Sequence, residues 1–186
     1  IAMCGKYNSL HDAYKSILEA LIHAGVENIS KVNVKWVDSE KLEKNNTQIN
    51  SYFKDVDGII IPGGFGDRGI EGKILSAKYA RENNIPFLGI CLGLQCAVID
   101  YARHVCNMKN ANSTEFNSAV KFPVIDLMNK QKNVSKKGAT MRLGKYNCNI
   151  KSKTKASLAY GKRIINERHR HRYEVNNKFR NKLIDN

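Results

Sequence analysis

The sequence predicts an α/β protein with a flavodoxin-like, doubly wound, mostly parallel sheet. Over residues 1–105, short apolar runs typical of buried strands alternate with segments whose apolar residues recur at helical spacing. A glycine-rich turn follows one of these runs and a cysteine follows another, at the place where open α/β sheets bind ligands. These observations favour a helix-covered sheet with a site at the carboxyl ends of its strands.

The first strand and helix follow from hydrophobic spacing. Residues 1–4 form an apolar run that predicts a strand. A helical face comes next, and Gly25 is expected to end that helix as a C-terminal stop. The face consists of Leu10, Tyr14, Ile17, Leu18 and Leu21.

The next elements continue the alternation. Residues 32–36 alternate between apolar and polar and predict a second strand, whereas residues 39–50 indicate only a short helix. Residues 57–61 end in three consecutive isoleucines, as expected for a third strand that is covered on both faces. Residues 70–83 predict a helix that leads into the fourth strand.

Cys91 lies where the chain changes from strand to helix. Residues 85–90 read as a buried strand, and apolar residues recur at helical spacing after the cysteine, which predicts a nucleophile elbow. Gly89 and Gly93 remove the β-carbons that would collide in so tight a turn. At a helix N-terminus the free amides and the helix dipole are expected to favour the thiolate. The alternative is that Cys91 is only a small buried hydrophobe.

The glycine-rich loop at residues 62–66 follows the third strand. It could be a simple turn, but its position predicts that the amide of Gly64 meets that of Leu92 near the sulfur of Cys91. Two such amides form an oxyanion hole. A side chain at Gly64 is expected to obstruct the loop.

The composition fits one cytoplasmic globular domain without a metal site. The chain has 186 residues, of which 42% are hydrophobic, and lacks the run of about 18 apolar residues that a membrane span needs. Its five cysteines are odd in number and have no CxxC spacing, which argues against a disulfide framework and a zinc site.

Positive charge is concentrated in the second part of the chain. The net charge is +14, and residues 111–186 hold 18 of the 31 Lys and Arg but 5 of the 17 Asp and Glu. A nucleic-acid- or nucleotide-binding module is therefore one hypothesis, and steep loss of binding with rising salt would support it. The cations are scattered, however, which favours a solvated face or a surface for anionic nucleotides or a partner domain.

Five segments together resemble the glutamine amidotransferase domain of the CTP synthase family, and the similarity runs nearly end to end. The elbow alone would indicate only a class I, triad-type glutamine amidotransferase, whereas the MRLG and RHRHRYEVN sequences are specific to the CTP synthases. The segments are residues 62–66 (PGGFG), 89–95 (GICLGLQ), 112–116 (NSTEF), 138–144 (GATMRLG) and 167–176 (ERHRHRYEVN).

The resemblance implies roles for individual residues. Cys91 matches the nucleophile, and Gly64 and Leu92 match the oxyanion donors. The implied substrate-binding residues are Gly63, Phe65, Gly93, Leu94, Gln95, Glu115, Arg172 and Tyr173.

Glu115 and Arg172 suit the two charges of glutamine. In the family pattern Gln95 and Glu115 hold the α-amino end, and Arg172 takes the α-carboxylate beside Phe65 and the backbone of Tyr173. A carboxylate and a bidentate guanidinium are the expected partners for an ammonium and a carboxylate. Without the resemblance, the run of charges around Arg172 would be read as a solvated surface, and Glu115 as the fourth residue of a helix capping box.

The resemblance also implies what surrounds this domain. The chain is expected to be one glutamine amidotransferase domain, residues 1–186, without the N-terminal synthetase domain and the C-terminal His-Pro-Glu segment that supplies the general base. Glutamine would be hydrolysed through a γ-glutamyl thioester, and the ammonia would pass to the synthetase domain of the same polypeptide, which converts UTP to CTP with ATP and Mg²⁺. GTP as an allosteric effector and a homotetramer built through the synthetase domain are further expectations, with no cofactor in this domain, no nucleic acid and no membrane.

The resemblance leaves two questions about the activity: which group serves as the general base, and whether glutamine is the substrate. No histidine of the chain is followed by Pro-Glu, and neither His169 nor His171 is expected to replace the missing base, so this ligase fragment should turn over slowly by itself. Another elbow-cysteine hydrolase of the same fold, such as a peptidase- or deglycase-like protein, is the second enzyme hypothesis; its substrate would not need both Glu115 and Arg172.

Overall fold

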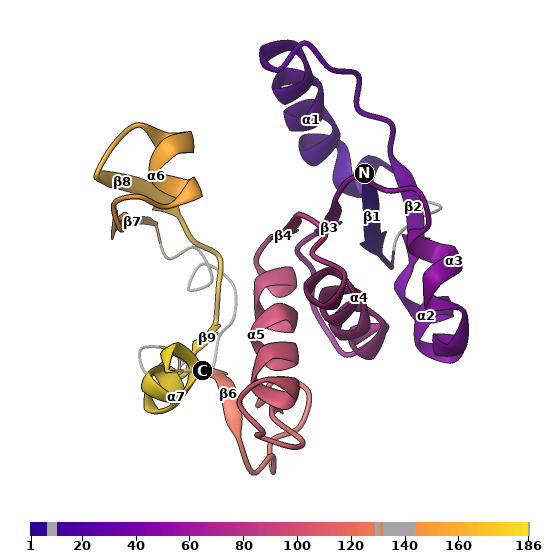
Figure 1. Ribbon diagram of the computed structural model, residues 1–186. Helices are drawn as coiled ribbons and strands as arrows, with labels where there is room; N and C mark the ends of the chain where they lie inside the picture. Colours follow the sequence, from indigo (N-terminus) through magenta and orange to yellow (C-terminus); the bar gives the residue numbers. More distant parts are fainter. Residues whose placement is uncertain (7–10, 129–130, 132–143, 186) are drawn as a thin grey trace. The chain divides into compact units, whose positions relative to one another are not determined.

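The computed structural model describes residues 1–6, 11–128, 131 and 144–185, and its contacts divide the chain into two units (Figure 1). The first unit comprises Ile1–Asp126 and Val175–Asn186, and the second comprises Leu127–Glu174. Most of the GATMRLG segment lies outside the described residues.

A four-stranded parallel sheet forms the centre of the first unit. Its strands are β1 (Ala2–Gly5), β2 (Lys35–Asp38), β3 (Ile59–Ile61) and β4 (Phe87–Gly89), in the spatial order β2-β1-β3-β4. This is the beginning of the flavodoxin-like order, in which the first strand lies between the second and third. The predicted parallel α/β architecture is therefore confirmed.

Helices connect these strands, as the sequence predicted. They are η1 (His11–Tyr14), α1 (Lys15–Glu27), α2 (Ser39–Lys44), η2 (Asn46–Gln48), α3 (Ile49–Phe53), α4 (Ile70–Glu82) and α5 (Leu92–His104). Figure 1 shows α5 directly after β4, with α4 beside it. Every connection between the strands of this sheet therefore contains helix, as is usual for parallel strands.

Two predicted boundaries were wrong. The first helix passes through Gly25 to Glu27, because Gly25 serves a close approach: a β-carbon there would lie 2.4 Å from the carbonyl oxygen of Ser30. The second strand begins at Lys35 and not at residue 32, since Ala2 of β1 pairs with Lys35.

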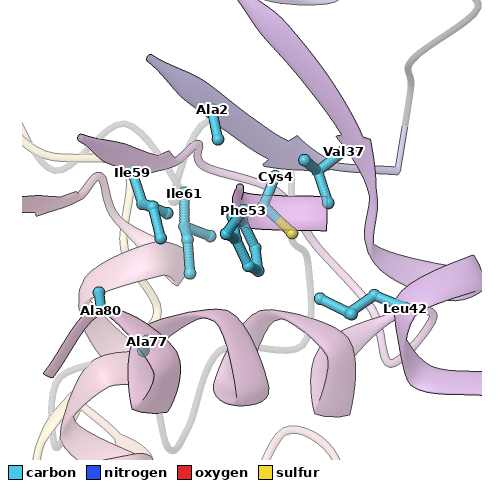
Figure 2. Packing of buried hydrophobic residues seen from close by; sticks show 9 residues of the cluster. All are labelled: Ala2, Cys4, Val37, Leu42, Phe53, Ile59, Ile61, Ala77 and Ala80. Carbon is cyan, nitrogen blue, oxygen red and sulfur yellow. The ribbon is translucent and has the colours of Figure 1, made fainter. Parts of the chain in front are cut away.

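The core lies between the sheet and the helices α2, α3 and α4 (Figure 2). Ile59 and Ile61 on β3 point toward α4, which presents Ala77 and Ala80. Ile60 is buried as well, so β3 is covered on both faces, as its uninterrupted hydrophobicity predicted. The labelled core residues are Ala2, Cys4, Val37, Leu42, Phe53, Ile59, Ile61, Ala77 and Ala80.

A second sheet has the strand order β5-β6-β9. Its strands are β5 (Asn112–Ser113), β6 (Pro123–Leu127) and β9 (Tyr173–Val175), and β5 runs parallel to β6. After β9 the chain forms η5 (Asn177–Phe179) and α7 (Arg180–Ile184). Asn176 donates its backbone N–H to the carbonyl of Val124 at 2.8 Å, which ties the end of the chain to the first unit.

The second unit contains an antiparallel pair, β7 (Lys145–Asn149) and β8 (Ile164–Arg168), joined by α6 (Lys155–Tyr160). Thr154 and Ser157 form a capping box at the start of α6, and Gly161 ends it in the left-handed conformation, φ 59°. None of the helices within the described ranges is long and apolar enough to cross a membrane.

Candidate active site

The backbone at Cys91 forms the predicted elbow. Cys91 is the N-cap of α5 with φ 55° and ψ −105°, a conformation that non-glycine residues seldom adopt. The N–H of Ile90 donates to Ile61 of β3 at 2.9 Å, and that of Gly93 donates back to Ile90 at 2.9 Å. Strain of this kind clusters at functional sites and persists where the surrounding structure imposes it.

The two elbow glycines are required by the packing. A β-carbon on Gly89 would lie 2.5 Å from the carbonyl carbon of Gly93, and one on Gly93 would lie 2.1 Å from the carbonyl oxygen of Ile61. Both approaches are to backbone, which cannot move aside as a flexible side chain can. The predicted role of these glycines is confirmed.

Two amides converge on the thiol of Cys91. The backbone N–H groups of Leu92 and Gly64 both hydrogen-bond to it, and each lowers its pKa. Burial outweighs them and raises the pKa of the Cys91 thiol above its ordinary value, and Glu115 raises it further. The expectation that the helix N-terminus yields a favoured thiolate was therefore wrong, because the thiol loses more hydration than the two amides replace.

The glycine-rich loop passes close to Cys91. The β-carbon that Gly63 lacks would lie 3.4 Å from Cβ of Cys91 and 4.0 Å from its sulfur. At Gly64 a β-carbon would meet Cδ2 of Leu92 at 3.4 Å and Nζ of Lys73 at 3.9 Å, which are ordinary contacts. The expectation that any side chain at Gly64 obstructs the loop was wrong for a methyl group, because a β-carbon there makes only ordinary van der Waals contacts.

Glu115 lies beside the same loop. Its Oε1 accepts the N–H of Gly66 at 3.4 Å, and its own N–H donates to Oγ of the buried Ser113 at 3.1 Å. Residues 114–122 form turns, so the capping-box alternative for Glu115 fails: no helix begins there. The structure thus brings Glu115 to the loop that holds Gly64, 49 residues away from Gly66 in the sequence.

The remaining predicted residues of the first unit belong to the glycine-rich loop and to the elbow. Leu94 and Phe65 are large apolar residues with 53% and 61% of their surface exposed, and Gln95 is buried in the first turn of α5. Exposed apolar side chains near a partly buried cysteine suit a substrate that enters from solvent. Their contacts with a substrate stay predictions, as do the roles of Gly63 and Gly93.

Arg172 and Tyr173 belong to the second unit. Nε of Arg172 donates to Oε1 of Gln131 at 3.4 Å, and its carbonyl accepts the N–H of Met128 at 2.8 Å. The arginine is thus held within its own unit by backbone and side chain. Its role at the α-carboxylate, and that of Tyr173 beside it, stay predictions.

Sequence reasoning overlooked Lys73. This lysine of α4 is 1% exposed, and its ammonium lies beneath Gly64. The signal was available, because position 73 falls on the same helical face as Ile70, Ile74 and Ala77, all of which are buried. A charged residue on an apolar face deserves a structural explanation.

Comparisons with known proteins identify the family. A family profile described as glutamine amidotransferase class-I matches residues 9–185. Curated relatives named CTP synthase are 59% identical in Chlorobium phaeobacteroides and 57% identical in Clostridium kluyveri, each over 100% of this chain. The chain spans about a third of the length of these relatives, 33% and 34%.

A solved structure is also similar. It is the Trypanosoma brucei CTPS glutaminase domain with bound acivicin, which matches with a TM-score of 0.90 and 38% identity over 99% of this chain and 70% of that chain. The fold, the elbow cysteine and these matches agree with one another. The chain therefore belongs to the class-I glutamine amidotransferase family, and within it to the glutaminase domains of CTP synthases.

Proposed function

We propose that Cys91 is the nucleophile that cleaves the side-chain amide of L-glutamine in this domain. The observation that carries the proposal is the pair of amides, from Gly64 and Leu92, that point at one cysteine held in a strained elbow. This arrangement supports acyl transfer, because such donors can stabilise the negative oxygen that forms when a thiol attacks a carbonyl.

The proposed first step forms a thioester. The sulfur of Cys91 bonds to the carbonyl carbon (Cδ) of the glutamine side-chain amide, the carbonyl oxygen takes the negative charge near the N–H groups of Gly64 and Leu92, and the C–N bond then breaks. The leaving nitrogen takes one proton and departs as ammonia. Water hydrolyses the thioester, which releases glutamate and restores the thiol.

The raised pKa of Cys91 means that this chemistry needs a base. At neutral pH the thiol holds its proton, so a neighbouring group has to accept that proton and deliver it to the leaving nitrogen. His104 cannot serve, because it lies at the far end of α5, about 20 Å along the helix from Cys91. The 186 residues contain no His-Pro-Glu, so we expect this chain by itself to hydrolyse glutamine slowly.

Glutamine specificity is proposed to come from two charged residues. Glu115, next to the glycine-rich loop, suits the α-ammonium, and Arg172 suits the α-carboxylate. Gly63, Phe65, Gly93, Leu94, Gln95 and Tyr173 are proposed to complete the pocket.

Active-site labelling tests the nucleophile. An electrophilic glutamine analogue, such as a diazo-ketone or acivicin, should modify Cys91 in preference to Cys4, Cys96, Cys106 and Cys148, and excess glutamine should protect it. Cys91→Ser should abolish the labelling, whereas Cys148→Ser, at an exposed cysteine, should leave it unchanged. Equal labelling of all five thiols, without protection by glutamine, would contradict the proposal and favour a different elbow-cysteine hydrolase or a binding module.

The whole protein is proposed to be a CTP synthase, the name that its relatives carry. In that proposal the ammonia passes to a synthetase domain of the same polypeptide, which makes CTP from UTP with ATP and Mg²⁺; GTP as an effector and a tetramer built by the synthetase domain belong to the same proposal. The described residues include no group of three or more His, Cys, Asp or Glu side chains that could hold a metal ion, so none is assigned to Mg²⁺.

We propose a reducing compartment, the cytoplasm, as the place where the domain works. All five cysteines are unpaired, and three of them are buried among core residues. Unpaired structural thiols are typical of proteins that fold under reducing conditions.

A further inference from the structure

We propose that Lys73 is a positioning residue for the oxyanion hole: its buried ammonium beneath the glycine-rich loop keeps the amide of Gly64 turned toward Cys91. The inference rests on the proposed function, since it concerns how the donor of that reaction is held. It gives a function to the buried ammonium of Lys73, which neither the packing of the core nor the proposed reaction requires.

The position of the ammonium is the first observation. Lys73 lies in the first turn of α4, immediately after the loop, and only 1% of its surface is exposed. Its Nζ lies 3.9 Å from the point where Gly64 would carry a β-carbon, and Leu92, the other proposed donor, lies on the same inner side at 3.4 Å from that point. The cation therefore faces the loop from the side of the core.

The second observation is that no carboxylate among the described residues forms an ion pair with this charge. Burial lowers the pKa of Lys73. Cys4 and Cys96 are near it, but burial raises their pKa values to about 11 and about 12, so both are neutral thiols at neutral pH. Glu40 also interacts with Lys73 but is ion-paired to Arg68 at 3.4 Å.

A second cation lies at the same loop. The ammonium of Lys6, at the end of β1, donates to the carbonyl oxygen of Phe65, and Lys6 and Lys73 are close enough for each charge to affect the other. An isolated ammonium in the interior is costly, so two cations around one loop require a compensating interaction. The peptide groups of the loop provide dipoles that can orient toward them.

The orientation of those dipoles gives the inference its mechanism. A cation beneath the loop attracts carbonyl oxygens and repels N–H groups, so the loop is more stable with its carbonyls inward and its amides outward. The amide of Gly64 does point outward, since it hydrogen-bonds to the thiol of Cys91. Glycine itself imposes little conformational preference, which makes an external charge an effective way to fix the peptide orientation.

Two reactions of the same cysteine separate this role from a merely structural one. Acylation by a chromogenic γ-glutamyl anilide passes through an oxyanion and releases the aniline before any thioester hydrolysis is needed. Alkylation by iodoacetamide displaces iodide at a saturated carbon and forms no oxyanion. Only the first reaction should depend on how the amide of Gly64 is oriented.

The test replaces Lys73 by methionine, which has a similar length and no charge. We expect Lys73→Met to slow acylation by about tenfold or more, since lost oxyanion donors cost that much or more, while alkylation of Cys91 stays within about twofold. Lys73→Gln should behave in the same way. Lys78→Met removes a partly exposed lysine of the same helix, ion-paired to Glu82 at 3.9 Å, and should change neither rate.

Three outcomes would overturn the inference. Equal loss of acylation and alkylation would mean that Lys73 supports the elbow as a whole, and unchanged acylation in both Lys73 variants would mean that the charge is idle. If excess glutamine fails to protect Cys91 of the unmodified chain from an electrophilic glutamine analogue, the proposed function fails, and the inference falls with it.

Discussion

Gly93 packs directly on the backbone of Ile61: a β-carbon on the glycine would lie 2.1 Å from the carbonyl oxygen of the isoleucine. The same oxygen accepts the N–H of Ile90 at 2.9 Å, so β3 holds both sides of the elbow. We predict that Gly93→Ala forces α5 away from the sheet and lowers the free energy of unfolding by roughly 3 kcal/mol or more. Urea unfolding monitored by circular dichroism measures it, and a loss below 1 kcal/mol would contradict the close packing.

Gly64 provides the opposite case in the same site. A β-carbon there meets Leu92 and Lys73 at 3.4 Å and 3.9 Å, without backbone overlap. We predict that Gly64→Ala changes the free energy of unfolding by less than about 1 kcal/mol and leaves the thiol of Cys91 open to alkylation. Gly93→Ala under the same conditions is the matched comparison, and a Gly64→Ala variant as unstable as Gly93→Ala would show that the loop is tighter than its geometry indicates.

These two glycines mark how far the sequence could predict the site. The change from strand to helical spacing at Cys91 was sufficient to predict the elbow, because a strand-to-helix turn with glycines on both sides of the cysteine has few alternative structures. The sequence placed Gly64 in the right loop. It could not show whether a side chain at position 64 would point into the core or toward Cys91, because that direction depends on tertiary packing. The parallel sheet could be predicted, whereas the start of β2 could not, since Ala2 of the neighbouring strand sets it.

The charged residues show the same limit. Glu115 was predicted from family resemblance, and its place beside Gly66 comes from a contact between segments far apart in the sequence. The burial of Lys73 was visible in the spacing of α4, but its position beneath Gly64 was not. The pKa of Cys91 was predicted in the wrong direction, because sequence shows the helix N-terminus and not the amount of water that the thiol loses.

That pKa gives the next prediction. Because burial and Glu115 raise the pKa of Cys91, its alkylation by iodoacetamide should increase with pH and reach its midpoint above about 8.5, the value for a free thiol. Glu115→Gln should move the midpoint downward, since it removes one of the groups that raise the pKa. Glu82→Gln, at the exposed end of α4, is the control and should leave it in place. A midpoint below that of free cysteine would mean that the amides outweigh burial.

Arg172 and Arg168 offer a test of substrate binding. If Arg172 takes the α-carboxylate of glutamine, Arg172→Ala should weaken binding by about 1.5–3 kcal/mol, or roughly ten- to a hundredfold. Arg168, on the exposed strand β8, should have no such effect when it is replaced by alanine. Protection of Cys91 from labelling by increasing glutamine measures both variants, and equal, small effects would show that the arginine run is only a solvated face.

The buried thiol of Cys96 predicts how stability changes in alkali. Burial raises its pKa to about 12 in the folded chain, so it keeps its proton at pH values where the unfolded chain, with an ordinary thiol, has lost it. The stability it supports is complete below about pH 9 and is lost as the pH rises toward 12, by about 1.4 kcal/mol per pH unit. Cys96→Ala should therefore destabilise the protein near neutral pH but make its stability fall less steeply above pH 9.

Met108→Ala, which truncates a fully buried residue that carries no ionisable group, should cost the same free energy at every pH and is the matched control. Urea unfolding between pH 8 and 11 compares the two, and parallel pH curves for Cys96→Ala and the unmodified chain would show that this thiol ionises alike in the folded and unfolded states.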